Sequence, residues 1–249
     1  MCQEKSSVAN VARELERGRE SYKRHAWADA YKSLSLADEV VPLHVEDLEL
    51  LAMSAYLIAR DDDYLRALNR AYQAHLDASE SSRGARCAFW LGLRLLFRGE
   101  TGRATGWFAR AKRLLEGQEQ PCVEEGYLLV PAAEQQLDAG DCEAAYAIAA
   151  DAAKIGGRFG ETDLIAIARH LQGRALIQQG HVEQGLALLD EAMLAVTAGE
   201  LSPLVTGLIY CSVIDGCHQV YAVGRARQWT AALAQWCAAR PESVDFTVP

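Results

Sequence analysis

Several features that mark secreted, membrane-bound or metal-binding proteins are missing from this sequence. Its seven cysteines are odd in number and widely spread, and no Cys-x-x-Cys pair occurs, which suits a reducing compartment and says little about metals. No window of about 18 uninterrupted apolar residues exists, so no membrane span is predicted. The segment Met1–Glu20 is polar and charged, unlike a signal peptide. These absences together predict a cytoplasmic protein.

The motifs of common enzyme classes are absent as well. The sequence contains no Gly-x4-Gly-Lys-Ser/Thr, His-Glu-x-x-His or Gly-x-Ser-x-Gly. The glycine-rich segments 99–106 and 156–160 follow no predicted strand, and the repeat described below places both at helix turns. We therefore predict that the chain is not an enzyme and that it binds no cofactor.

Positive charge is also scarce, because the formal net charge is −9. Affinity for nucleic acid depends mainly on cationic side chains that meet phosphates, so direct binding to DNA or RNA is not expected. The densest basic cluster is predicted to be the solvated face of a helix; it comprises Arg103, Arg110, Lys112 and Arg113.

Alanine and leucine are abundant, and only six prolines interrupt the chain, which favours helices over strands. The clearest internal pattern begins at Gly92 and continues with Ala104, Phe108 and Ala111. Small residues at these positions let two helices cross closely, and the large apolar residue fills the gap between them. This spacing is the packing pattern of the tetratricopeptide (TPR) repeat.

The same pattern recurs along the whole chain. Its first positions are residues 18, 55, 92, 133, 173 and 220, so the spacing is 37 to 47 residues, longer than the strict repeat of 34. The matching sets are Gly18, Ala30, Leu34 and Ala37; Ala55, Ala67, Ala71 and Ala74; Ala133, Ala145, Ala149 and Ala152; Gly173, Gly185, Leu189 and Ala192; and Ala232, Trp236 and Ala239.

Helix-ending and helix-starting residues support this division. Gly99, Gly140 and Gly180 fall between the two helices of three consecutive pairs, where a left-handed C-cap is favoured. N-cap oxygens are predicted from Asp61–Asp63, Thr101 and Asp141, and Ser202-Pro203 is a favourable helix start. We predict one all-α domain over residues 1–249, a right-handed TPR-like α-solenoid of about six antiparallel helix pairs. The predicted pairs span residues 8–42, 45–80, 82–117, 122–157, 161–199 and 202–240.

Three segments also resemble a known family. Leu48–Leu68, Arg86–Glu116 and Ser202–Cys237 resemble the helical-repeat region of large LuxR-type bacterial transcriptional regulators, actinobacterial members above all. The resemblance covers about residues 13–246. It implies a sensor or assembly surface without catalytic residues, which receives a small inducer or a partner protein.

The chain also departs from that family. The DNA-reading module of such regulators is a C-terminal helix-turn-helix, whereas this sequence stops at Val248-Pro249 without one, and no ATPase motif is present. We therefore expect a sensor-like region that does not itself bind DNA in the manner of the family.

In a TPR superhelix, the first helix of each pair lines the concave groove. The family pattern places a mixture of aromatic and charged residues there, which suits an extended peptide or a polar small molecule. The predicted groove residues are Arg19, Tyr22, Glu49, Tyr56, Arg86, Phe89, Tyr127, Glu134, His170, Arg174, Cys217 and Tyr221. His170 and Arg174 lie on one helix face and could jointly hold an anion, but the favoured interpretation is a surface histidine beside an arginine that pairs with a neighbouring acid.

Cys211, Asp215 and His218 form one stripe of the last predicted first helix. This stripe resembles a metal site, but a single helix rarely supplies a full tetrahedral shell, so hydrogen bonding inside a packing contact is the favoured interpretation. A metal-dependent enzyme built on a helical solenoid, which would use Asp215, His218 and Glu134, is the less favoured alternative.

The sequence therefore predicts a non-catalytic interaction module that binds a peptide, a partner protein or a small effector in its groove, in bacterial transcriptional regulation. A self-associating scaffold is a further alternative. Trp229 and Trp236 lie close to the last predicted helix pair, which has no obvious polar capping helix after it, and an exposed terminal face would favour homo-oligomers.

Overall fold

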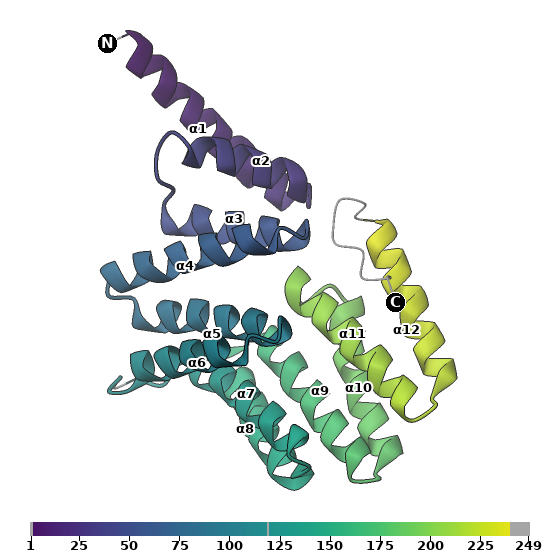
Figure 1. Ribbon diagram of the computed structural model, residues 1–249. Coiled ribbons are helices and arrows are strands. Elements are labelled where there is room, and N and C mark those ends of the chain that lie inside the picture. Colours follow the sequence, from purple (N-terminus) through teal and green to yellow (C-terminus); the bar gives the residue numbers. More distant parts are fainter. Residues whose placement is uncertain (1, 119, 240–249) are drawn as a thin grey trace.

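The protein is a stack of helical hairpins. Its structure is a computed structural model, which describes residues 2–118 and 120–239, with side chains from residue 10 onward. Twelve α-helices occur in this part of the chain, in six antiparallel pairs that follow one another through the stack (Figure 1). They are α1 (Cys2–Lys23), α2 (Trp27–Asp38), α3 (Val45–Leu57), α4 (Asp61–Asp77), α5 (Ser81–Phe97), α6 (Thr101–Leu115), α7 (Glu124–Asp138), α8 (Cys142–Phe159), α9 (Thr162–Gln178), α10 (Val182–Thr197), α11 (Pro203–Gln219) and α12 (Val223–Ala238).

Five of the pairs lie close to the residue ranges predicted from the sequence. The first pair differs, because α1 begins at Cys2, several residues before the predicted start at residue 8. The predicted end of the last pair, residue 240, lies outside the described residues.

The small residues of the repeat pattern lie where two helices of a pair cross. A Cβ atom on Gly18 would lie 2.7 Å from Cγ of Leu34, so only glycine fits at this crossing. In the fifth pair a Cβ atom on Gly173 would lie 2.9 Å from the carbonyl oxygen of Gly185 and 2.9 Å from Cδ2 of Leu189. The repeat read from the sequence therefore corresponds to close approaches between the two helices of a pair.

The last pair uses a different register from the predicted one. Ala226, Trp229 and Leu233 are the buried residues of α12, whereas Ala232 and Trp236 are only partly buried and Ala239 is exposed. The predicted packing residues of α12 were therefore wrong. The helix turns toward α11 a different face from the one that the repeat pattern indicated.

The turn glycines and two of the predicted helix starts behave as expected. Gly99, Gly140 and Gly180 have φ values of 74°, 80° and 87°, the left-handed conformation that ends a helix. Asp141 accepts a hydrogen bond from the backbone N–H of Ala144 and so caps α8. Ser202 caps α11 in the same way, accepting from Val205 N–H.

Two other predicted caps were wrong. Thr101 is the first residue inside α6, and Glu100 precedes it without a capping hydrogen bond. Asp61–Asp63 form the first turn of α4, where carboxylates interact favourably with the helix dipole.

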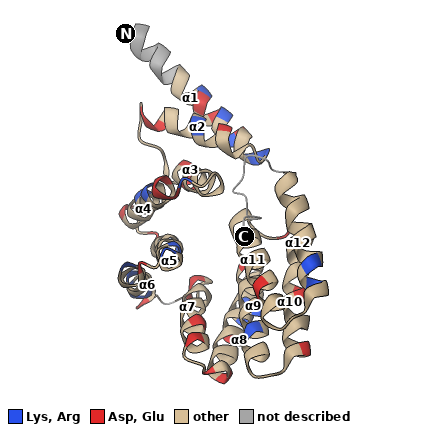
Figure 2. Ribbon diagram, turned by 45° about the vertical axis from the view of Figure 1, so that its right-hand side comes forward, with Lys and Arg blue, Asp and Glu red and all other residues tan. Residues whose placement is uncertain are grey.

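The buried apolar residues form two clusters, one centred on α2–α5 and one extending from α5 to α12. Tyr56 of α3 and Trp90 of α5 pack against both clusters. Helices α7–α12 curve back toward the first half of the stack (Figure 2). In addition, α11 comes into contact with α3. The concave side is therefore narrowed by a contact between distant repeats.

No helix in the described ranges is both long enough and apolar enough to cross a membrane.

Candidate functional site

A cavity of about 490 Å³ lies where the first three repeats meet α11. We call it the inner cavity, because its walls come mainly from the first helices of the pairs. Its lining combines aromatic, aliphatic and charged side chains from six helices: Tyr22, Glu49, Leu50, Ala52, Met53, Tyr64, Leu68, Arg83, Arg86, Cys87, Trp90, Glu124 and Leu204. A volume of this order is typical of sites for small molecules or for a few side chains of a peptide.

The apolar part of the inner cavity is assembled from three separate helices. Leu50 and Met53 lie one turn apart on α3, Trp90 lies on α5, and Leu204 lies in the first turn of α11. Leu50, Met53 and Trp90 keep part of their surface accessible to solvent, whereas Leu204 is buried. A partner side chain placed here would remove apolar surface of both halves of the stack from water, which is the main favourable contribution to association.

One charged wall of the inner cavity is an ion-pair network around Arg86. Its Nε and Nη2 atoms lie 3.1 Å and 3.0 Å from Oε1 of Glu124, and its Nη1 lies 3.5 Å from Oε1 of Glu161. The guanidinium carbon lies 4.6 Å from the ring centroid of Tyr127, whose hydroxyl donates to Glu161 at 2.9 Å. Burial alone lowers the pKa of Arg86, but Tyr127, Glu124 and Glu161 outweigh it and raise the pKa above its usual value.

A second polar group surrounds His75, a fully buried residue in the last turn of α4. Nε2 of His75 lies 2.9 Å from Oε1 of Glu49, and Nδ1 lies 2.7 Å from Oε2 of Glu80. Cys87 of α5 completes this group, since its sulfur, a ring nitrogen of His75 and a carboxylate oxygen of Glu49 all lie within 4.8 Å of one another. Burial, assisted by the charge of Glu49, raises the pKa of the Cys87 thiol to about 12.

Three of the predicted groove residues line the inner cavity, namely Tyr22, Glu49 and Arg86. Two others do not reach it and lie farther along the stack. Glu134 and Arg174 pair with each other, with Nη1 of Arg174 2.7 Å and 2.8 Å from the two carboxylate oxygens.

Arg19 and Tyr56 lie beside the inner cavity but outside its lining. Arg19 forms a bidentate pair with the buried carboxylate of Asp47, with both distances 2.7 Å. Tyr56 packs against Tyr64 at a centroid distance of 5.3 Å and carries the guanidinium of Arg94 over its ring.

The remaining predicted positions need correction, because the structure does not place them on the groove surface. Phe89 and Cys217 are fully buried, Tyr127 is 1% exposed, and His170 is 2% exposed. These side chains turn into the packing between repeats instead of toward solvent. Tyr221 is 88% exposed and has a φ of 55°. It lies in the turn after α11 and not on the helix, because α11 ends at Gln219, two residues earlier.

The two candidate ion sites proposed from the sequence also differ from the structure. The favoured interpretation is confirmed for Arg174, which pairs with the acid Glu134, and was wrong for His170, which is buried and not on the surface. These residues therefore present no shared anion site at the surface. Cys211, Asp215 and His218 lie on an exposed face of α11, where Asp215 accepts a hydrogen bond from Gln219 at 2.7 Å. The predicted packing contact for Asp215 and His218 was therefore wrong.

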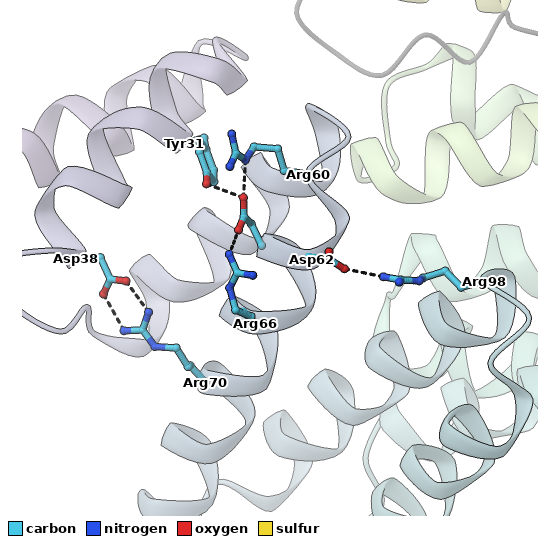
Figure 3. A network of polar contacts seen from close by, with 8 residues as sticks. Tyr31, Asp38, Arg60, Asp62, Arg66, Arg70 and Arg98 are labelled. Carbon is cyan, nitrogen blue, oxygen red and sulfur yellow. Dashed lines mark hydrogen bonds and ion pairs between the residues drawn. The ribbon is translucent and has the colours of Figure 1, made fainter.

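Another set of charges braces helices α2, α4 and α5 (Figure 3). Asp63 accepts a 2.7 Å hydrogen bond from the hydroxyl of Tyr31 and pairs with Arg60 and Arg66. Figure 3 also shows Arg70 paired with Asp38 and Arg98 paired with Asp62. Because the charges here satisfy one another, this network stabilises the stacking of repeats and is a weaker candidate for ligand recognition.

Sequence reasoning missed several residues of the site, chiefly Trp90, Leu204, His75 and Cys87. Trp90 is adjacent to the predicted Phe89 on α5, so the prediction of which face of α5 lines the groove was wrong by one residue. His75 lies on a second helix of a pair, and Leu204 reaches the cavity only because the stack curves back. No local sequence signal indicates either position.

No protein-family model matches the chain, and no curated protein matches its sequence. Among solved structures, the chain is similar to a Rap protein crystallised in complex with Competence and Sporulation Factor, with a TM-score of 0.60 and 12% identity over 94% of this chain and 76% of that one. The TPR2AB domain of yeast Sti1, in a complex with pHSP90, aligns over 94% of both chains at 12% identity with a TM-score of 0.36. The similarity to the Rap protein concerns the fold alone. The all-α, TPR-like solenoid predicted from the sequence is confirmed.

Proposed function

We propose that this protein is a non-catalytic interaction module that binds a peptide segment of a partner protein in the inner cavity. The observation that carries this proposal is the composition of the cavity wall. Partly exposed apolar side chains from α3 and α5 lie beside charges of both signs, and the buried Leu204 of α11 closes the far side. Such a wall can hold an apolar side chain and orient the polar backbone around it.

The charges around the cavity indicate which peptide would fit. Arg83 carries a well-exposed side chain, and its one ion pair in the described part of the chain, with Glu80, is long at 3.7 Å. Arg83 is therefore the cation most available to a ligand, whereas Arg86 is already engaged by Glu124 and Glu161. We expect a peptide that combines a large apolar side chain with an acidic group.

The likeness to the Rap protein complex supports this proposal as an analogy of fold. The resemblance to LuxR-type regulators supports a role in transcriptional regulation inside the cytoplasm. In this proposal a small effector molecule can equally take the place of the peptide, since the volume of the inner cavity accommodates a small molecule as well as a few side chains of a peptide.

The proposal is tested by selecting binders from a random peptide library displayed on phage and measuring their affinity by calorimetry. Selected peptides should bind Trp90→Ala at least about 30-fold more weakly than the wild type, because a central aromatic contact is often worth about 2 kcal/mol or more. Arg83→Gln should lower the affinity for acidic peptides more than the affinity for neutral peptides. Leu194→Ala is the matched control, since Leu194 is an exposed apolar residue on α10, remote from the inner cavity.

Two results would count against the inner cavity as the site. One is the absence of any enriched peptide for the folded protein. The other is a set of peptides that bind Trp90→Ala and the wild type equally well.

A further inference from the structure

Three helices bring a nitrogen, a sulfur and a carboxylate to one point at the edge of the inner cavity. Glu49 comes from α3, His75 from the end of α4, and Cys87 from the second turn of α5. These three residue types are the ligands that zinc uses in proteins. From this juxtaposition we infer that Glu49, His75 and Cys87 form a binding site for a zinc-like divalent cation.

The distances between the three ligand atoms are close to those of a zinc site. Zinc–ligand bonds of about 2.0 to 2.3 Å in a tetrahedron place neighbouring ligand atoms roughly 3.3 to 3.8 Å apart. Here all three atoms lie within 4.8 Å of one another, and Nε2 of His75 lies 2.9 Å from Oε1 of Glu49. An ion therefore requires Glu49 to move back by about half an ångström and Cys87 to approach by about 1 Å or less, which are side-chain adjustments.

Glu80 strengthens the assignment because it holds the outer nitrogen of the imidazole. Its carboxylate accepts from Nδ1 of His75 at 2.7 Å, which leaves Nε2 facing Glu49. Metal-binding histidines usually have such a partner, because it fixes the orientation of the ring and increases the electron density on the metal-bound nitrogen. Arg83, 3.7 Å from Glu80, moderates the negative charge of this second carboxylate.

Charge and access are also suitable. Glu49 and a Cys87 thiolate together supply two negative charges, which a divalent cation neutralises. On binding, the thiol proton and the proton shared between Nε2 of His75 and Glu49 leave to solvent. His75 and Cys87 are buried, whereas the side chain of Glu49 is 45% exposed. Glu49 and Cys87 both line the inner cavity, so an ion can enter from that side, and water supplies the fourth ligand there.

The ligand set selects among metals. A thiolate with an imidazole favours zinc and its spectroscopic substitute cobalt over magnesium or calcium, which prefer oxygen ligands. Metal binding at this site does not require a bound peptide, so it can be tested independently of the proposed function.

The test uses the full chain, reduced, stripped with a chelator and titrated anaerobically with Co²⁺. The wild type should take up one ion per chain and show a thiolate-to-cobalt charge-transfer band with intense tetrahedral d–d absorption, and Zn²⁺ should abolish both. Cys87→Ser should lose the charge-transfer band, whereas Cys211→Ser, which alters an exposed cysteine of α11, should keep it.

Two carboxylate variants keep the proposal testable if Cys87→Ser does not fold. Glu49→Gln alters a half-exposed ligand and should weaken Co²⁺ binding strongly without changing the circular dichroism spectrum. Glu80→Gln should weaken it about 10- to 100-fold, the usual effect of removing a partner of a metal-bound histidine. Glu46→Gln, on an exposed position of α3, is the control and should bind like the wild type.

The inference is overturned if the wild type shows no charge-transfer band with Co²⁺. It is equally overturned if folded Cys87→Ser retains that band or if Glu49→Gln binds Co²⁺ as tightly as Glu46→Gln.

Discussion

A Cβ atom on Gly92 would lie 2.6 Å from Cε1 of Phe108, far inside van der Waals contact. Gly92 belongs to α5 and Phe108 to α6, so this approach sets the distance between the two helices of the third pair. The aromatic ring lies where any larger residue at position 92 would place its side chain. Helix propensity, which favours alanine over glycine, is therefore overridden here by packing.

Gly92→Ala should accordingly destabilise the protein. Overpacking of this kind typically costs about 1 to 3 kcal/mol, and the higher helix propensity of alanine offsets only part of that cost. Urea denaturation followed by circular dichroism measures the difference. An unchanged midpoint would show that Phe108 can turn away freely.

Gly106→Ala is the matched substitution with the opposite expected sign. Gly106 lies within α6 and is exposed, and a Cβ atom added to it would meet no described neighbour within 4 Å. Alanine should stabilise the protein by about 0.5 to 1 kcal/mol, since glycine loses more backbone freedom on folding. Destabilisation by Gly106→Ala in the same urea experiment would contradict this account of the two glycines.

Sequence reasoning predicted the parts of the fold that depend on local spacing. Gly18, Gly92 and Gly173 occupy the close crossings that the pattern required, and Gly99, Gly140 and Gly180 end helices in the left-handed conformation. These features could be read from the chain because each depends only on residues within a single helical hairpin.

The site was less predictable because it depends on the curvature of the whole stack. Leu204 reaches the inner cavity only after the small rotations between successive repeats have accumulated. The group of Glu49, His75 and Cys87 needs the relative rotation of three helices, which the repeat pattern leaves undefined. Phe89 and Cys217 were misplaced for the same reason: their helices are packed on more sides than a simple groove allows.

Acid should destabilise the fold through His170. Burial, with a smaller contribution from Arg174, lowers its pKa to about 3 from the ordinary value of 6.5, so the folded state excludes a proton that the unfolded state accepts. Stability therefore begins to fall as the pH drops below about 6.5 and continues to fall until the pH reaches about 3. Between about pH 7 and pH 5 this single group should remove about 2 kcal/mol.

His170→Leu should abolish that part of the pH dependence. Within the described chain, neither ring nitrogen of His170 has a hydrogen-bond partner, so leucine removes a buried polar group without breaking a bond. The variant should be at least as stable as the wild type near neutral pH and clearly more stable about two pH units lower. Parallel urea titrations at the two pH values test this, and equal losses in both proteins would contradict the assignment.

Ion pairs in this protein should differ in their contribution to stability according to burial. Arg19→Ala removes the bidentate partner of Asp47, a carboxylate that is 1% exposed, and should cost about 1 to 3 kcal/mol, because a buried charge is left with weaker compensation. Lys154→Ala removes an exposed pair with Asp151 within α8 and should cost less than about 0.5 kcal/mol. Similar losses for the two variants, measured by thermal unfolding, would argue against this ranking.

The contact between α3 and α11 changes how the stack should unfold. In an open repeat array, each unit touches only its neighbours, so stability is a sum of local terms and either end can fray alone. Here a helix of the second pair is held by a helix of the sixth, which raises the mean sequence separation of contacts and slows folding. The second and sixth pairs should consequently unfold together, so a perturbation of α11 is expected to lower the stability of α3.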